Sequence, residues 1–78
     1  MTNKNQYLSL IRRKEVETRT GLSRSTIYAR IAAGTFPPPI DLGGGRAVGW
    51  LESDIDGWIR QRISESRRDN SGDVDGSY

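Results

Sequence analysis

The side chains best suited to chemistry lie within one nine-residue run, TGLSRSTIY, at positions 20–28. Their polar groups are a guanidinium, several hydroxyls and a phenol, carried by Ser23, Arg24, Ser25, Thr26 and Tyr28. Arginine can donate two hydrogen bonds to the edge of a guanine or to a phosphate, and short hydroxyl side chains can donate to phosphate oxygens. Free backbone N–H groups at the start of a helix attract the same anions. The run therefore predicts contact with double-stranded DNA.

The residue types within this run also predict a turn followed by the start of a helix. Gly21 suits the left-handed backbone at which one helix can end and another begin at a steep angle. Ser23 is a favoured N-cap residue, and Leu22 and Ile27 have the spacing of a hydrophobic staple across that cap. We therefore expect a helix that starts in a fixed direction and carries the polar groups on its first turn.

One helix is expected on each side of the turn. The first should cover residues 13–20, with a favourable i, i+4 pair between Glu15 and Arg19. The second should cover residues 24–33 and stop at Gly34. The inward-facing side chains should be Val16 and Thr20 on the first helix and Ile27 and Ile31 on the second. This pattern predicts a helix-turn-helix whose second helix enters the major groove.

The chain after this pair of helices predicts a small wing. Residues 35–39, TFPPP, should form a stiff extended connector, because prolines lack N–H donors and cannot continue a helix. Residues 40–42 and 47–50 are short apolar runs around a glycine-rich tip, a pattern typical of a β-hairpin. Arg46, at that tip, is positioned to contact the DNA backbone or the minor groove.

A third helix is expected to begin near Glu52 or Ser53, because Ser53 and Asp56 match a capping box. Its buried face should be formed by Ile55, Trp58, Ile59 and Ile63. Both tryptophans, Trp50 and Trp58, are expected in the core rather than as base-stacking groups. An extended segment containing Leu8, Leu10 and Ile11 should complete one side of that core. The acids Glu52, Asp54 and Asp56 suit the positive end of the helix dipole, which explains them without a metal site.

Composition limits the foldable part of the chain to one small domain. The chain has 78 residues, 33% of them hydrophobic, and few large apolar residues follow Ile63. We predict a flexible N-terminus over residues 1–7, a DNA-binding domain over residues 8–63 and a disordered polar tail over residues 64–78. The predicted fold class is mainly α with a small β-hairpin: a winged helix-turn-helix of three helices plus the wing.

The absence of cysteine and histidine narrows the functional classes. It removes disulfides, thiolate nucleophiles and the usual zinc or haem ligands, so we predict no enzyme activity, cofactor or metal. No signal peptide or membrane span is recognisable, which favours a cytoplasmic protein. Residues 1–50 contain eight Lys or Arg against three Asp or Glu, whereas residues 51–78 contain four against seven. The basic half supplies further candidate phosphate contacts, Arg13 and Lys14 first, with Arg12 and Arg19 beside them.

Three separated blocks of the chain together resemble the AlpA family of phage and prophage regulators. The blocks are residues 15–28, residues 34–37 and residues 43–59. Family members are small winged helix-turn-helix proteins related to MerR-like and excisionase-like DNA-binding domains. The resemblance implies a transcriptional regulator of a mobile element, acting in the bacterial cytoplasm on promoter or attachment-site DNA, with self-association or several copies on the DNA as a further expectation.

The resemblance also implies which residues contact DNA. These are Ser23, Arg24, Ser25, Thr26 and Tyr28 on the recognition helix, and Arg46 on the wing. Many relatives carry Arg or Lys along the later part of that helix, where this chain has Ala29, Ala32 and Ala33. The departure shifts the expected base contacts to the first turn of the helix and to Arg30.

Two other functions stay open at this point. The same fold could serve as an excisionase-like architectural factor that bends DNA at repeated sites. A protein-interaction module or antirepressor would instead use the acidic tail or the third helix as its contact surface. The role of Arg24 also stays open, because its guanidinium could bind either a base or a phosphate. A monomer of this size contacts few base pairs, so useful specificity requires repeated sites or a partner.

Overall fold

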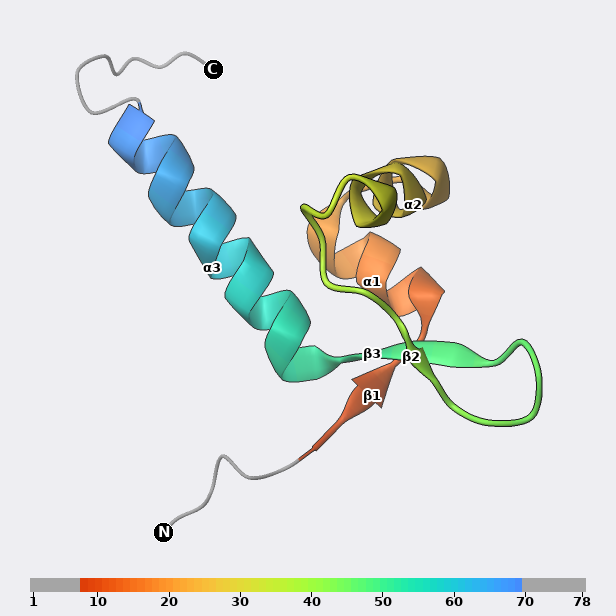
Figure 1. Ribbon diagram of the computed structural model, residues 1–78. Helices are drawn as coiled ribbons and strands as arrows, with labels where there is room; N and C mark the ends of the chain where they lie inside the picture. The colour runs from red at the N-terminus through yellow and green to blue at the C-terminus, as the bar shows by residue number, and fades with distance from the viewer. Residues whose placement is uncertain (1–7, 70–78) are drawn as a thin grey trace, which may run out of the picture.

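The computed structural model describes residues 8–69, which form three helices and a small antiparallel sheet (Figure 1). In chain order the elements are β1 (Leu10–Ile11), α1 (Arg13–Thr20), α2 (Arg24–Ala32), β2 (Ile40–Asp41), β3 (Val48–Leu51) and α3 (Glu52–Asp69). This architecture confirms the predicted fold class, mainly α with a wing-like hairpin, as in a winged helix-turn-helix.

The turn between α1 and α2 has the predicted caps. Gly21 has a φ of 77°, and its N–H donates to the Glu17 carbonyl oxygen at 2.7 Å, which ends α1. The Ser23 Oγ accepts a hydrogen bond from the Thr26 N–H at 3.2 Å, so Ser23 is the N-cap of α2. Gly34, with a φ of 80°, follows the end of α2. Local capping therefore sets the ends of both helices.

Strand β3 lies in the middle of the sheet, between β1 and β2. The β2–β3 pair is the predicted hairpin, and Gly43–Gly45 at its tip all have positive φ. The sequence predicts only an extended segment where the structure has β1, which pairs with β3 and places Ile11 opposite Trp50. Of that segment only Ile11 packs against the core. The same expectation is wrong for Leu8 and Leu10, because both are exposed. Alternation along β1 turns Leu10 to the face opposite Ile11.

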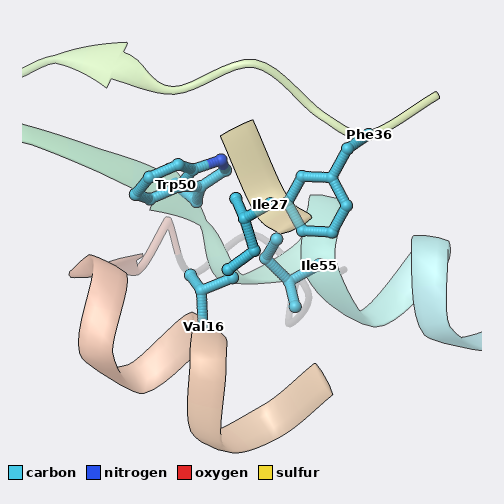
Figure 2. Packing of buried hydrophobic residues seen from close by; sticks show 5 residues of the cluster. All are labelled: Val16, Ile27, Phe36, Trp50 and Ile55. Carbon is cyan, nitrogen blue, oxygen red and sulfur yellow. The ribbon is translucent and has the colours of Figure 1, made fainter. Parts of the chain in front are cut away.

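The core takes one buried side chain from each of five segments, and these five side chains converge in Figure 2. They are Val16 of α1, Ile27 of α2, Phe36 of the connector, Trp50 of β3 and Ile55 of α3. The Trp50 indole N–H donates to the Pro37 carbonyl oxygen at 3.0 Å, so this polar group is satisfied inside the core. Trp58 is half-buried beside the core, with its ring edge-on to Phe36 at a centroid distance of 4.8 Å. Both tryptophans thus pack against the domain, as predicted.

Helix α3 begins at Glu52, one of the two predicted positions, but without the predicted capping box. Ser53 is the second residue of the helix and so cannot be its N-cap. The Glu52 N–H instead donates to the Ser9 carbonyl oxygen at 2.8 Å. A backbone contact with the segment before β1, which is distant in sequence, thus replaces the expected local capping box.

The second half of α3 projects away from the body of the domain (Figure 1). Ile63 is 44% exposed there, which corrects its assignment to the buried face. The helix continues past Ile63 because polar side chains one turn apart support it: Gln61 Nε2 donates to Glu65 Oε2 at 3.0 Å. Arg67 and Arg68 also place positive charge in the last turn, where the helix dipole favours it.

This extension changes the predicted boundary of the tail. Residues 64–69 were expected to be disordered and instead form the last turns of α3. The predictions for residues 1–7 and 70–78 lie outside the described residues. In the part of the chain that the structure covers, no helix combines the length and the hydropathy required to cross a membrane.

Candidate nucleic-acid interface

A cationic cleft of about 460 Å³ lies where α1, α2 and the wing meet. Its lining residues are Arg12, Arg13 and Lys14 at the start of α1, Arg24 and Tyr28 of α2, and Arg46 and Val48 of the wing. The structure thus brings together six of the candidate DNA-contacting residues, Arg12 among them, from three separate segments. Five of the seven lining side chains are cationic and none is acidic, so the cleft attracts anions.

The side of α2 that faces the cleft is held in place by the core. The Tyr28 ring lies edge-on to Trp50, with centroids 6.5 Å apart. The Arg24 guanidinium lies one helical turn earlier, 6.0 Å from the centroid of the Tyr28 ring. Because Trp50 is fully buried, this stack links the position of the Arg24 charge to the rigid part of the domain.

The start of α1 contributes cations and unpaired backbone donors. Arg12 occupies the N-cap position with β-region dihedrals, but its side chain makes no capping hydrogen bond. The first N–H groups of a helix have no partner within the helix, so they are available to an anion. Arg13 Nε donates to Glu17 Oε2 at 2.8 Å, which partly neutralises Arg13. Among the side chains that the structure describes, no carboxylate pairs with Lys14, Arg24 or Arg46.

Two other predicted residues are engaged in the cap of α2. Ser23 Oγ donates to Thr26 Oγ1 at 3.0 Å and accepts the Thr26 N–H. Both hydroxyls lie at the first turn but outside the lining of the cleft. Ser25 is exposed on the outer side of α2, together with Ala29 and Ala32. This outer side carries only short side chains, so the helix backbone can approach a groove closely.

Arg30 is separated from the cleft. Its guanidinium lies 5.9 Å from the ring centroid of Trp58, on the flank of α2 that faces α3. At about 100° per residue, Arg30 and Arg24 point from different sides of the helix. The structure therefore does not bring Arg30 together with the other predicted cations.

Arg19, which the sequence offers as a further phosphate contact, is occupied by carboxylates. Its guanidinium pairs with Glu52 at 2.7 Å, Glu15 at 3.1 Å and Asp56 at 3.4 Å. Hydrogen bonds from Arg19 and Ser9 lower the pKa of Glu52 below its ordinary value, and hydrogen bonds to Glu15 and Glu52 raise the pKa of Arg19. The sequence shows Glu52 and Asp56 among three acids within five residues, but not the cation that joins these two. This cluster ties α1 to α3, and among the described residues no group of acids is arranged to hold a metal ion.

Comparisons with known proteins match the part of the chain that builds the cleft. The family model described as prophage CP4-57 regulatory protein (AlpA) matches residues 9–63. An uncharacterized protein of Enterobacteria phage P4, ORF88, is 47% identical over 58 residues, covering 74% of this chain and 65% of that protein. The chain thus spans just under two thirds of that relative. The DNA-binding transcriptional activator AlpA of Escherichia coli (strain K12) is 35% identical over 66 residues, covering 77% of this chain and 93% of that protein.

Proposed function

The chain belongs to the AlpA family, and from this membership we propose that it is a sequence-specific double-stranded DNA-binding regulator of transcription in a phage or prophage-like element. The Escherichia coli relative is named as a DNA-binding transcriptional activator, which supports this class of function. The observation that carries the proposal is the cationic cleft, which lies beside the outer side of α2.

The proposed complex assigns different tasks to the two sides of α2. The outer side, with Ser25 and Ala29, enters the major groove, where a hydroxyl can bond a base edge and a methyl group can contact a thymine methyl. Arg24 and Lys14 bind phosphates of the strand beside the groove. Arg46, on the wing, binds the backbone or the neighbouring minor groove. In this proposal, Arg30 near the end of α2 and the Ser23 and Thr26 hydroxyls at its start make secondary contacts with the DNA.

This arrangement has a measurable electrostatic consequence. Neutralising about four to six phosphates predicts a slope of roughly −4 to −5 when log affinity is plotted against log salt concentration. The test uses a duplex selected from a random-sequence pool with the full chain. Binding that is insensitive to salt, or no binding to any duplex at low salt, would refute the proposal.

Variants separate the cleft from general positive charge. Arg24→Ala and Arg46→Ala should each weaken binding and reduce the salt slope by about 1. Arg60→Ala is the matched control, because Arg60 is an exposed cation on α3 outside the cleft. Equal losses for Arg60→Ala and Arg24→Ala would contradict the assignment of the cleft, and a selective loss at Arg24 and Arg46 would support it.

A further inference from the structure

The sheet has a second face, turned away from the core, that is entirely apolar. Cross-strand partners point to the same face, so Ile11 and Trp50 lie together on the core side. By the same register, Leu10 and Leu51 lie on the opposite side, as does Ile40, which is paired with Gly49. We call this surface the outer sheet face. Its strand residues are Leu10, Ile40 and Leu51, and we include Leu42, which directly follows β2 and lies beside Gly49, and Leu8, two residues before Leu10.

Most of these side chains are open to solvent. Leu8 is 83% exposed, Leu10 47%, Ile40 37% and Leu42 36%. They make up four of the six large exposed apolar side chains in the described part of the chain. Figure 1 shows α1 and α2 above the sheet and no described helix below it. A concentration of exposed aliphatic groups on one face is typical of an interaction site.

Gly49 gives this face its flat centre. A Cβ added at Gly49 would lie 3.3 Å from Leu42 Cδ1 and 3.1 Å from the Ile11 carbonyl oxygen. Leu42 therefore lies across the middle strand in the space that a side chain at Gly49 would fill. Leu42 thus extends the aliphatic surface from the end of β2 over β3, toward β1.

We propose that the outer sheet face binds a second copy of this chain, sheet against sheet. In the register of the sheet, no charged residue falls on this face, because Asp41 is paired with Val48 on the core side. The face therefore offers nothing to a polyanion. In a two-fold contact, each copy presents the same patch, so aliphatic groups meet aliphatic groups and no like charges are brought together.

The exposed area sets the expected strength of this contact. On one copy, the exposed parts of the four solvent-open side chains of the outer sheet face together equal about two fully exposed leucine side chains. A stable interface buries about 800 Å² on each partner, which is well above this amount. The dimer is therefore weak and forms at high protein concentration.

The second copy leaves the cationic cleft free. Val48 lines the cleft and lies on the core side of the sheet, so the cleft and the outer sheet face are on opposite sides. Self-association and DNA binding use separate surfaces, and the failure of either proposal leaves the other standing.

The test is the oligomeric state of the full chain without DNA. Sedimentation velocity from about 10 µM to about 1 mM should show a reversible monomer–dimer equilibrium, the range in which weak contacts are measurable. Leu10→Gln and Ile40→Thr should each raise the dissociation constant at least about tenfold, because each substitution replaces aliphatic groups with polar ones on both sides of the interface.

Ile63→Gln is the matched control, because Ile63 is 44% exposed and lies on α3, away from the sheet. Its dimerisation should equal that of the parent chain. Far-UV circular dichroism checks the fold of each variant. Ile40→Thr serves as the second variant if Leu10→Gln disturbs β1, because threonine is β-branched like isoleucine and suits a strand. A parent chain that stays monomeric throughout would overturn the proposal and assign the face to another occupant. An equal loss with Ile63→Gln would overturn it as well.

Discussion

Replacing Trp58 with alanine should strongly destabilise the domain, although this side chain is only half-buried. The indole makes three kinds of contact that alanine cannot make. Its ring is edge-on to Phe36 at 4.8 Å. Its N–H donates to the Thr35 carbonyl oxygen at 2.9 Å. Its face carries the Arg30 guanidinium at 5.9 Å. Together these contacts fasten α3 to the connector and to the end of α2.

The size of the loss follows from these contacts. Burial of part of a large aromatic side chain contributes about 2 kcal/mol, and an edge-to-face pair about 1 kcal/mol. The hydrogen bond adds about 1 kcal/mol. Since water can fill part of the space left by the half-exposed ring, we expect a net loss of about 3 kcal/mol for Trp58→Ala, at the low end for such substitutions. Domains of this size rarely exceed about 3–5 kcal/mol in total stability.

Urea denaturation followed by far-UV circular dichroism measures this loss without relying on tryptophan fluorescence. Trp58→Phe is the matched control, because it keeps a ring beside Phe36 and loses the bond to Thr35. It should cost about 1 kcal/mol and leave the domain folded. A midpoint for Trp58→Ala equal to that of the parent chain would refute the packing argument. Equal losses in the two variants would show that the ring itself contributes nothing.

Three shorter predictions concern the charges and the recognition helix. Hydrogen bonding lowers the pKa of Glu52, so the ionised Glu52 side chain should stabilise the fold fully above its ordinary pKa of 4.5. This stabilisation should be lost as the pH falls through the lowered pKa. In thermal melts from neutral to acid pH, the melting temperature should therefore fall less for Glu52→Gln than for the parent chain. Arg12→Asp should raise stability by about 1 kcal/mol while weakening DNA binding, as thermal melting and a binding titration can measure together; unchanged affinity would contradict the role of the cleft. If Ala29 contacts a thymine methyl, deoxyuridine at that position should weaken binding by about 1 kcal/mol, and no loss at any thymine of the selected site would exclude such a contact.

The parts of the fold that depend on local chemistry were predictable from the sequence. Gly21 and Ser23 set the ends of α1 and α2 through contacts within four residues, so their types and spacing were sufficient. Strand β1 was not predictable, because it exists only through pairing with β3, which lies far along the chain. The length of α3 was also missed, because the apolar pattern ends at Ile63 while polar i, i+4 contacts carry the helix further.

In the candidate site, too, the sequence predicted the residue types, whereas their arrangement depends on the tertiary structure. The sequence identified Arg24 and Arg46 as DNA-contacting candidates but could not establish that they line one cleft, since that depends on how the wing folds against α2. The sequence also grouped Arg30 with Arg24, although helical geometry turns it toward Trp58. Residue types therefore indicated the chemistry, and only the tertiary structure shows which of the cations line one cleft.

The start of α1 gives an independent reason to regard the cleft as functional. Three consecutive cations, Arg12–Lys14, stand at the positive end of the helix dipole, where each costs about 0.3–1 kcal/mol. The N-cap position has the backbone geometry of a cap, but it holds Arg12, which makes no capping bond where Ser, Asp or Asn would. The other helix of the motif has its cap, Ser23, so the fold does not prevent capping. In so small a domain, an uncapped and charge-opposed helix start is a sizeable cost to stability. The binding of an anion at this position would remove that cost, since it would satisfy the free N–H groups and neutralise the cations at once.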